Sequence, residues 1–436
     1  MALSTQPYKG ARDFYPEDKR LQKFMFDSIR KTVERYGYEE YDAPILESLD
    51  LYLAKTGEEI VNEQTYSFTD RGGRQVVIRP EMTPTVSRMV AAKRQELAYP
   101  LRWYSIPNLW RYERPQRGRL REHWQLNVDV FGLGDVQGEL EIITLGNQIF
   151  KDFGAKPDMY EIRLNSRVFM DYVLTEYLGL DTVEAHSIAK LIDRMNKIDQ
   201  AAFIAQADAI MSPSKREAGA VEKLMTVLQA RRFSALPADL QDHDAVAKLQ
   251  SVLSSLADAG IKNAVFDITL MRGFDYYTDV VFEIFDTDPD NNRSMMGGGR
   301  YDGLVALFGV EPVPTVGFGL GDATLANFLE SHRLIPVLPT ETHLYAAVIG
   351  DVQAPADRAI SELREMGINV AVGAAGRKLG DHFKVAEKKG IANILIIGSQ
   401  ELDSGQFVVK NLQTGVEEKH SLQRIVSLVN DYRSRA

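Results

Sequence analysis

The sequence predicts an α+β protein: a mostly antiparallel sheet with helices, a helical insertion within that sheet, and a small C-terminal α/β domain. Runs rich in aromatic and β-branched residues, which are typical of strands, occur before residue 132 and return after residue 263. Between them, residues 167–258 carry long helical patterns with polar connectors. We therefore expect a first domain over residues 1–330 that contains the insertion, and a second domain over residues 341–436.

Length, charge and cysteine content limit the class of protein. At 436 residues, the chain is longer than a single hydrophobic core usually organises. It has no cysteine, which excludes disulfides, thiolate nucleophiles and cysteine metal sites and fits a reducing cytoplasm. Its net charge of -10 disfavours indiscriminate nucleic-acid binding but permits a local basic surface. The start lacks an apolar signal core, and no segment approaches about 18 uncharged apolar residues, so we expect a cytoplasmic protein with no membrane partner.

The first expected element is a helix from Glu17 to Tyr36. Its apolar residues fall at helical spacing, and Gly37 follows as a C-cap. These apolar positions are Leu21, Phe24, Met25, Ile29 and Val33. A strand-like run that contains Pro44 comes next.

Five further runs predict the strands of the sheet. They are "RQVVIRPEMT" (74–83), "LRWYSIPNLWRYE" (101–113), "HWQLNVDVF" (123–131), "AVFDITLMRG" (264–273) and "YYTDVVFEIFD" (276–286). Because proline cannot donate to a strand ladder, the second run should bulge or lie near an edge at Pro107. The last two runs follow the helical patterns, so the sheet resumes after the insertion.

A linker and a second domain follow the sheet. The run "LIPVLPTET" (334–342) contains two prolines and is the best linker in the chain. After it, the apolar runs "HLYAAVIG", "INVAVG" and "NILIIG" each end in glycine and are separated by helical patterns. This alternation predicts a small α/β domain with a parallel component.

A basic stretch lies between two of the expected strands. Residues 111–122 hold five arginines and two glutamates, and Pro115 and Gly118 mark a loop. The flanking strands carry polar side chains on one face, where they must be exposed or bind something polar. These are Arg111 and Glu113 on the incoming strand and Gln125, Asn127 and Asp129 on the outgoing one. Arginine suits phosphate, while carboxylate and amide groups suit an amino group; a solvated hairpin is the alternative.

The same stretch, "RYERPQRGRLREH", resembles motif 2 of the class II aminoacyl-tRNA synthetases in its histidyl-tRNA synthetase form. "KGARDFYP" resembles that family's N-terminal signature, "YEEYDAPILE" its motif 1 at the dimer interface, and "RPEMT" its amino-acid loop. "MRGFDYYT" and "GGGRYDGL" resemble its histidine-specific motifs, and "GRKLGDHFKVAEKKG" its anticodon-binding domain. The resemblance implies a class II catalytic domain with a helical insertion, a C-terminal anticodon-binding domain and a homodimer.

The resemblance also implies a reaction, in which ATP and L-histidine form histidyl-adenylate and the histidine is then transferred to tRNA(His), with Mg²⁺ as cofactor. Because negative charge builds on the α-phosphate, the site needs preorganised cations. Arg111 and Arg272 are the implied catalytic residues; for Arg272, a structural pair with Asp275 is the alternative. The implied ATP-binding residues are Arg111, Glu113, Arg119 and Arg121.

The implied histidine site combines carboxylates, an amide and tyrosines. Its residues are Glu81, Thr83, Gln125, Asp129, Tyr276, Tyr277 and Tyr301. Glu81 and Gln125 match the family's ligands for the α-amino group. Asp129 stands where the family usually has glutamate, and its shorter side chain is compatible with a bridging water. The tyrosines offer an imidazole both an apolar face and a hydroxyl group; core packing is the alternative for them.

Two groups of residues are implied for tRNA binding. Arg114 and Gln116 lie on the motif 2 loop, whose family role is shared between ATP phosphates and the tRNA acceptor end. Arg377, Lys378 and Lys384 lie in a segment with five basic residues and only two acidic ones. Basic side chains suit the backbone of the splayed anticodon nucleotides; a solvated helix face is the alternative.

One motif departs from the family pattern. Motif 3 ordinarily carries a glutamate and an arginine that binds the ATP γ-phosphate, but "VGFGLGDATLANF" has Ala323 and Thr324 at these positions. Another cation, Arg119 or Mg²⁺, would then neutralise the γ-phosphate, and without one ATP binding would be lost. Together with "EMT" and "EHWQLNVDVFG", this pattern resembles an organelle-like bacterial branch of the family.

Rival classes of function can be compared with the ligase. A regulatory paralogue of the synthetase, which binds histidine without charging tRNA, is the main alternative, although it normally lacks the anticodon-binding domain. The clusters "GGGRYDG" and "GFGLG" do not follow the G-x-G-x-x-G order of dinucleotide sites, and no G-x-x-x-x-G-K-S/T sequence occurs. The seven histidines include no i, i+4 pair of the kind found on zinc-binding helices, which disfavours a metal hydrolase.

Overall fold

The computed structural model of the protein describes residues 3–53, 64–271, 276–291 and 293–433. They form two units, residues 1–14 with 22–335 and residues 15–21 with 336–436. Within the described residues, no helix is both long and apolar enough to cross a membrane.

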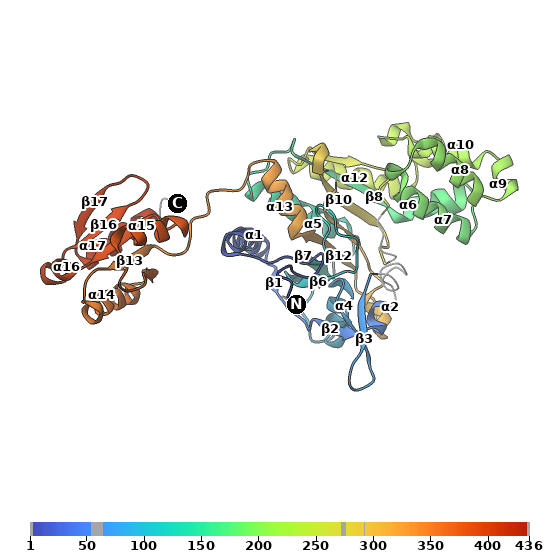
Figure 1. Cartoon of the computed structure of the whole chain (residues 1–436). Helices are drawn as coiled ribbons and strands as arrows, with labels where there is room; N and C mark the ends of the chain where they lie inside the picture. The colour runs from blue at the N-terminus through green and yellow to red at the C-terminus, as the bar shows by residue number, and fades with distance from the viewer. Residues whose placement is uncertain (1–2, 54–63, 272–275, 292, 434–436) are drawn as a thin grey trace. The chain divides into compact units, whose positions relative to one another are not determined.

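A large, mostly antiparallel sheet organises the first unit (Figure 1). Its strands, in spatial order, are β1 (Glu39–Glu40), β5 (Leu101–Ser105), β7 (Glu122–Phe131), β12 (Thr315–Gly321), β11 (Ser294–Arg300), β10 (Val280–Asp286), β8 (Tyr160–Ser166) and β9 (Ala264–Phe266). The pairs from β5 to β8 are antiparallel, and only the outermost pairs, β1 with β5 and β8 with β9, are parallel. A short strand, β6 (Asn108–Trp110), pairs with β7 beside this path, and the break at Pro107 is confirmed.

Two of the predicted strands are shorter than their sequence runs. The run over residues 74–83 ends as a strand at Ile78, and Thr83 begins a helix with Pro84 in its first turn. The run over residues 264–273 ends as a strand at Phe266. There, the Asp267 carboxylate accepts hydrogen bonds from the backbone and hydroxyl of Thr269, and this local turn replaces the ladder.

The two faces of the large sheet have different roles. Even-numbered residues of β7 and β12, such as Leu126, Val128 and Phe318, are buried on the side of the helices α5 (Val136–Asp152) and α13 (Asp322–Ser331). Side chains alternate along a strand, so the odd-numbered residues of β7 form the opposite face. That face carries Gln125, Asn127 and Asp129, as the sequence pattern predicted.

Several helices accompany the large sheet. They are α1 (Pro16–Arg35), α4 (Thr83–Ala92), α5 (Val136–Asp152) and α13 (Asp322–Ser331). The predicted first helix is confirmed: Met25, Ile29 and Val33 are buried, and Gly37 adopts a φ of 80° beyond its end. This left-handed conformation is unfavourable for a residue with a Cβ atom and is typical of a helix C-cap.

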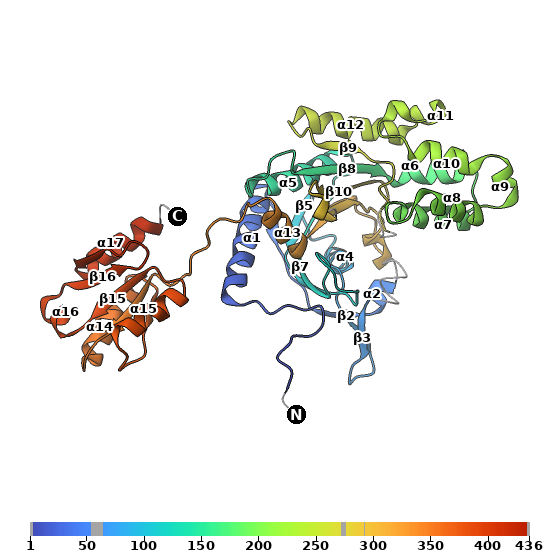
Figure 2. The same cartoon turned by 45° about the horizontal axis from the view of Figure 1, so that its top comes forward.

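Residues 167–258, all of which are described, contain helices and no strand, as predicted. The main ones are α6 (Arg167–Tyr172), a π-helix η1 (Val173–Tyr177), α7 (Thr182–Asp193), α8 (Gln200–Ile210), α9 (Pro213–Glu217), α10 (Ala220–Leu228), α11 (Ala238–Gln241) and α12 (Asp244–Asp258). Two short 3₁₀ turns also lie in this range, η2 (Met195–Lys197) and η3 (Phe233–Ala235), while η4 (Pro289–Asn291) and η5 (Val305–Phe308) lie beyond it. The last helix, α12, returns to the large sheet and packs against α5, β8 and β9 (Figure 2).

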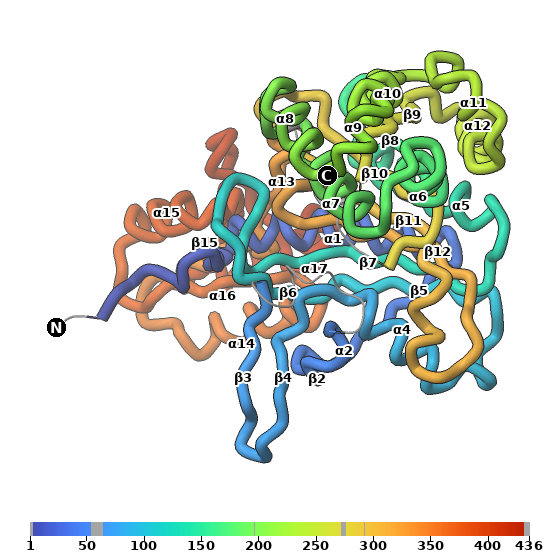
Figure 3. The backbone as a smooth tube through the Cα atoms, turned by 90° about the vertical axis from the view of Figure 1, so that its right-hand side faces the viewer, coloured from blue at the N-terminus to red at the C-terminus, as the bar shows by residue number. Residues whose placement is uncertain are grey.

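A small antiparallel sheet stands beside the large one in the first unit. It consists of β2 (Leu46–Ser48), β4 (Gln75–Ile78) and β3 (Tyr66–Thr69), with helix α2 (Asp50–Leu53) against it. Figure 3 shows β3 and β4 as a projecting hairpin. Val77 packs with Tyr52 on one face, whereas Leu46 and Phe68 are exposed on the other.

The second unit is a five-stranded sheet with helices on both faces. Its strands, in spatial order, are β14 (Val370–Val372), β13 (Leu344–Val348), β15 (Asn393–Ile397), β16 (Phe407–Asn411) and β17 (Glu417–His420). Its helices are α14 (Gln353–Glu365), α15 (Leu379–Lys388), α16 (Ser399–Ser404) and α17 (Leu422–Arg433). The three predicted strands β13, β14 and β15 are parallel, and the antiparallel hairpin of β16 and β17 extends them.

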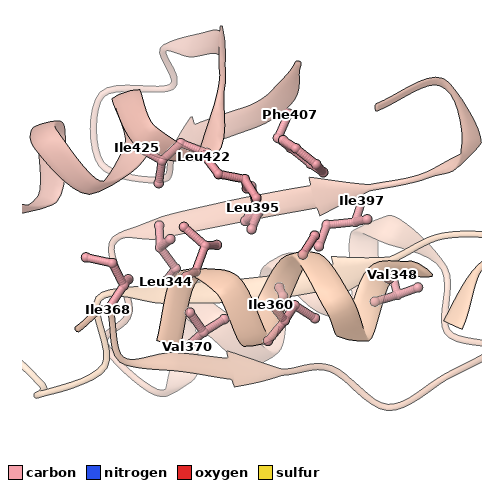
Figure 4. Packing of buried hydrophobic residues seen from close by; sticks show 14 of the residues in the cluster. Leu344, Val348, Ile360, Ile368, Val370, Leu395, Ile397, Phe407, Leu422 and Ile425 are labelled. Atoms are coloured by element: carbon pink, nitrogen blue, oxygen red, sulfur yellow. The ribbon is translucent and has the colours of Figure 1, made fainter. Parts of the chain in front are cut away.

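Alternating residues of β13 separate the two cores of this unit. Leu344 and Val348 pack with Ile360 of α14 and Ile425 of α17 on one face (Figure 4). On the other face, Tyr345 and Ala347 pack with Ala386 of α15. Helix α15 therefore lies on the face of the sheet opposite to α14 and α17.

Candidate active site

A polar pocket lies on the odd-numbered face of the large sheet. Its walls include all seven residues that were predicted to bind histidine, together with Arg111. Those seven are Glu81, Thr83, Gln125, Asp129, Tyr276, Tyr277 and Tyr301. They come from segments that are far apart in the sequence, so the fold itself assembles the pocket.

Strand ends deliver most of these side chains. Glu81 and Thr83 lie where the chain leaves β4 and enters α4, and Arg111 directly follows β6. Tyr277 precedes β10, and Tyr301 follows β11 on the neighbouring strand. Residues at strand ends combine a backbone fixed by the sheet with side chains directed into open space, which suits ligand binding.

Glycines form the floor of the polar pocket, and they were not among the predicted site residues. Gly317 lies opposite Asp129, and Gly319 lies opposite Asn127. A Cβ atom on Gly317 would overlap Asp129 Oδ1, and one on Gly319 would overlap Gln125 Nε2. The bare backbone therefore leaves room for polar side chains to lie across it. The alternating glycines in "VGFGLG", beside the alternating polar residues of β7, are a signal for this floor.

Hydrogen bonds fix the segment that carries Glu81. The hydroxyl group of Tyr276 donates to Glu81 Oε2 at 3.1 Å, and that of Tyr52 donates to the Glu81 carbonyl oxygen at 3.2 Å. Arg111 Nε donates to the carbonyl oxygen of Pro80 at 2.8 Å. Glu81 is only 3% exposed, so its carboxylate is held in a fixed orientation at the pocket wall.

Asp129 is a buried acid of the polar pocket with a strongly raised pKa. Burial raises its pKa to about 7, although the hydrogen bond that Tyr301 donates to Oδ1 acts in the opposite direction. Its buried Oδ2 atom has no hydrogen-bond partner among the described residues. A buried polar atom of this kind normally has a partner, so we infer that Oδ2 bonds to a ligand or a water.

We expect this burial to be visible in the stability of the protein. Between about pH 4 and pH 7, the folded state keeps the Asp129 proton, whereas the unfolded state, with the ordinary pKa of 3.8, has lost it. The unfolded state then binds fewer protons, so the contribution of Asp129 to the free energy of unfolding falls as pH rises through this window. Asp129→Asn should remove this contribution, which urea unfolding at several pH values measures.

Asp70 provides the control for this measurement. Hydrogen bonds from the backbone and side chain of Arg74 lower the pKa of Asp70. Asp70→Asn should therefore affect the pH dependence only below about pH 4. If Asp129→Asn left the slope between pH 4 and pH 7 unchanged, the buried, protonated state of Asp129 would be wrong.

The predicted residues of the motif 2 loop lie outside the lining of the polar pocket. Glu113 forms an ion pair with Arg119 at 2.7 Å. Arg121 lies over the ring of Tyr112 at 3.9 Å and donates to the hydroxyl group of Tyr8 at 3.1 Å. Arg114 and Gln116 are exposed on the loop. Arg272 and Asp275 lie outside the described residues.

The start of α13 shows what occupies the motif 3 position. Thr324 is buried, and its hydroxyl group donates to the carbonyl oxygen of Gly321 at 3.0 Å. A Cβ atom on Gly118 would lie 3.2 Å from Thr324 Cγ2, so the motif 2 loop packs directly against this helix. Asp322 pairs with Arg12 at 2.6 Å, a contact that the sequence could not predict because the two residues are 310 positions apart.

The three predicted tRNA-binding residues of the second unit gather at one helix. Lys378 is the N-cap residue of α15, Arg377 precedes it, and Lys384 lies on the helix. All three are exposed. Burial and the charge of Arg377 lower the pKa of His382, a buried residue of the same helix.

Comparisons with known proteins agree along the whole chain. Residues 10–325 match the model of the histidyl-tRNA synthetase family, and residues 336–432 match that of an anticodon binding domain. The chain is 44% identical to a histidine–tRNA ligase of Leptospira biflexa over 412 residues, 94% of each chain. It is 37% identical to one of Thermoplasma volcanium, with 97% of this chain and 98% of that one covered.

Solved structures show the same fold. The crystal structure of histidyl-tRNA synthetase from Nostoc sp. PCC 7120 matches with a TM-score of 0.80 at 23% identity, and all of both chains is covered. A structure from Bacillus halodurans, described as an ATP phosphoribosyltransferase regulatory subunit/histidyl-tRNA synthetase, matches with a TM-score of 0.74 at 21% identity and covers 92% of this chain. The matched models and the close relatives therefore establish that the chain belongs to the histidyl-tRNA synthetase family.

Proposed function

We propose that the polar pocket is the adenylation site of a histidine–tRNA ligase. The observation that carries this proposal is the assembly, in one pocket, of an arginine, two carboxylates, two amides and three tyrosines. Such a set matches both ends of the substrate: Glu81 and Gln125 suit the α-ammonium group, and Asp129 with the tyrosines suits the imidazole. Thr83 completes the wall beside Glu81.

The chemistry of the first step follows from this arrangement. An oxygen of the histidine carboxylate attacks the α-phosphorus of ATP, the bond from that phosphorus to the bridging oxygen breaks, and pyrophosphate leaves. Arg111, at the pocket wall, stabilises the negative charge that develops on the α-phosphate. Arg272 is proposed for the opposite side of this phosphate on the resemblance of its sequence motif alone.

Further partners belong to this proposal. Mg²⁺ would enter with ATP, because this ion is held mainly by substrate phosphates and one or two carboxylates. The described residues contain no group of three or more His, Asp or Glu side chains that could hold a metal ion. In the second step, a hydroxyl group of the terminal ribose of tRNA(His) attacks the histidyl carbonyl and AMP leaves. Arg114 and Gln116 are proposed to contact the acceptor end, and we place the activity in the cytoplasm.

An assay of ATP–pyrophosphate exchange with each standard amino acid tests the function. We expect exchange with histidine only. The regulatory paralogue would be silent in this assay, and the match of residues 336–432 to an anticodon binding domain disfavours it. A chain that is folded but shows no histidine-dependent exchange would contradict the proposal.

The small sheet supports the proposal of a homodimer. One face of this sheet combines Leu46, Ile78 and Tyr66 in one row with Val76 and Phe68 in the next. Leu46 and Phe68 are 46% and 47% exposed. A second copy of the chain would cover such an apolar face, as the resemblance of "YEEYDAPILE" to motif 1 implies.

Light scattering tests the homodimer. We expect the full chain to have twice its mass of 49.0 kDa in solution. Phe68→Asp should weaken the dimer because a charge would be buried at the interface. Val183→Asp is the control, since Val183 is 76% exposed on α7. Equal masses for both variants at every concentration would argue against this interface.

A further inference from the structure

We propose that Lys248, on helix α12, is a positioning residue for the histidine pocket, because its ammonium group forms ion pairs with both Asp279 and Glu139. Asp279 continues the segment that carries Tyr276 and Tyr277, so this ion-pair bridge would hold the two tyrosines in place. The inference rests on the proposed function, which assigns the polar pocket to histidine. Lys248 itself does not line that pocket.

The ammonium group of Lys248 contacts both carboxylates. Lys248 Nζ lies 2.5 Å from Asp279 Oδ2 and 3.3 Å from Glu139 Oε1. Glu139 is 1% exposed at its side chain, and Asp279 is 18% exposed. The hydrogen bond to Asp279 and the two carboxylate charges raise the pKa of Lys248 although burial lowers it, so the amine stays charged.

Asp279 is an anchor between the pocket segment and the sheet. Its Oδ1 atom accepts a hydrogen bond from Ser166 Oγ at 3.0 Å, and its carbonyl oxygen accepts one from the backbone of Arg167 at 2.9 Å. Two residues before it, Tyr277 lines the polar pocket, and directly after it β10 begins at Val280. A displacement of Asp279 would therefore be transmitted to the tyrosines at once.

Glu139 links Lys248 and Asp279 to the other wall of the pocket. Arg300 binds Glu139 through Nε at 2.8 Å and through a terminal nitrogen at 2.6 Å. The next residue, Tyr301, donates its hydroxyl hydrogen to Asp129 in the pocket. Moreover, the backbone nitrogen of Thr278 donates to the carbonyl oxygen of Arg300 at 2.8 Å. The two tyrosine-bearing segments are thus joined to each other and to Lys248.

Removal of Lys248 would affect the two carboxylates unequally. Glu139 would keep its two-point contact with Arg300. Asp279, in contrast, has no other ion pair among the described residues and would lose its only cation. An unpaired carboxylate at a partly buried position is unfavourable, so Asp279 should move toward water and loosen the tyrosine segment.

The experiment is steady-state pyrophosphate exchange with the full-length chain. Lys248→Met keeps the length of the side chain but removes its charge, and we expect KM for histidine to rise about tenfold, because small displacements of positioning groups have large effects. KM for ATP should stay within about twofold. Lys248→Arg should restore most of the loss, since it keeps the charge. Asp279→Asn should reproduce the effect. In the double variant Lys248→Met/Asp279→Asn, KM for histidine should be no higher than in either single variant.

Arg102→Met is the matched control. Arg102 binds Glu141 at 2.7 Å, and the exposed fractions of this pair, 25% and 17%, nearly equal the 25% and 18% of Lys248 and Asp279. Helix α12, which carries Lys248, and helix α5, which carries Glu141, pack on the same sheet. Arg102, on strand β5, is not linked to a tyrosine of the pocket. We expect Arg102→Met to lower the melting temperature about as much as Lys248→Met without a change in KM for histidine.

Two outcomes overturn the proposal. If KM for histidine in Lys248→Met stays within twofold of the wild-type value, or rises equally in Arg102→Met, the role of Lys248 is only structural. Should Lys248→Met fail to fold, Asp279→Asn decides in its place, because it removes the same charge pair. A wild-type chain without histidine-dependent exchange would instead overturn the proposed function, and this inference with it.

Discussion

Gly319→Ala is expected to lower kcat/KM for histidine in pyrophosphate exchange by at least about 100-fold. The added methyl group would overlap the Gln125 amide, which we propose as a ligand of the α-ammonium group. Gln125 would have to rotate into the space of the substrate, because the strands β7 and β12 fix both backbones. Most of the loss should therefore appear as weaker histidine binding, which calorimetry measures directly.

Gly303→Ala is the control for this substitution. Gly303 is in the nearby sequence "GGGRYDG", and a Cβ atom there would meet nothing within 4 Å. We expect this variant to keep its exchange activity and its melting temperature. If Gly319→Ala bound histidine within about tenfold of the wild-type affinity while it remained folded, the histidine site would have to lie elsewhere.

The strands of the large sheet were predictable because their local pattern agrees with their environment. In β7, the residues Leu126, Val128 and Val130 alternate with Gln125, Asn127 and Asp129, so the sequence shows which face is polar. Strand ends were less predictable. The carboxylate of Asp267 ends β9 by a hydrogen bond within a turn, and such side-chain competition is not visible in an apolar pattern.

The candidate site was also predictable only in part. Side chains of the pocket such as Gln125, within β7, and Tyr301, directly after β11, could be predicted from motifs that are continuous in the sequence. The contacts that hold them could not. Lys248 meets Asp279 across 31 positions, and Arg300 meets Glu139 across 161, so only the fold brings these charges together. An isolated lysine on a helix has the same sequence pattern whether it is solvated or paired.

The motif 2 loop shows that residue type alone does not define a role. Five arginines in residues 111–122 suggested a surface for phosphates. In the structure, Arg119 pairs with Glu113, and Arg121 stacks on Tyr112, so local partners already engage both guanidinium groups. ATP would have to displace these contacts or use other cations. The sequence could not reveal this competition, because it depends on the path of the loop.

Replacement of Arg377, Lys378 and Lys384 by alanine is expected to lower kcat/KM for the charging of tRNA roughly 10- to 100-fold at low salt. These exposed residues at the start and along the length of α15 would contact the phosphates of the anticodon nucleotides. Pyrophosphate exchange needs no tRNA and should be unchanged. Each lost contact to a single strand lowers the salt dependence by about 0.7, so the slope of the logarithm of kcat/KM against the logarithm of salt concentration should flatten by about 2.

A second triple variant separates contact from overall charge. Arg358, Lys419 and Arg424 are exposed residues of α14, β17 and α17, and α14 and α17 lie on the opposite face of the sheet from α15. Their replacement by alanine also removes three positive charges, so it weakens the long-range attraction of the tRNA as much as the first triple variant does. It should leave the salt slope nearly unchanged, because no phosphate contact is lost. If both triple variants charged tRNA equally well, or lost activity equally, the basic segment at α15 would be a solvated helix face, and the tRNA would have to bind this unit through another surface.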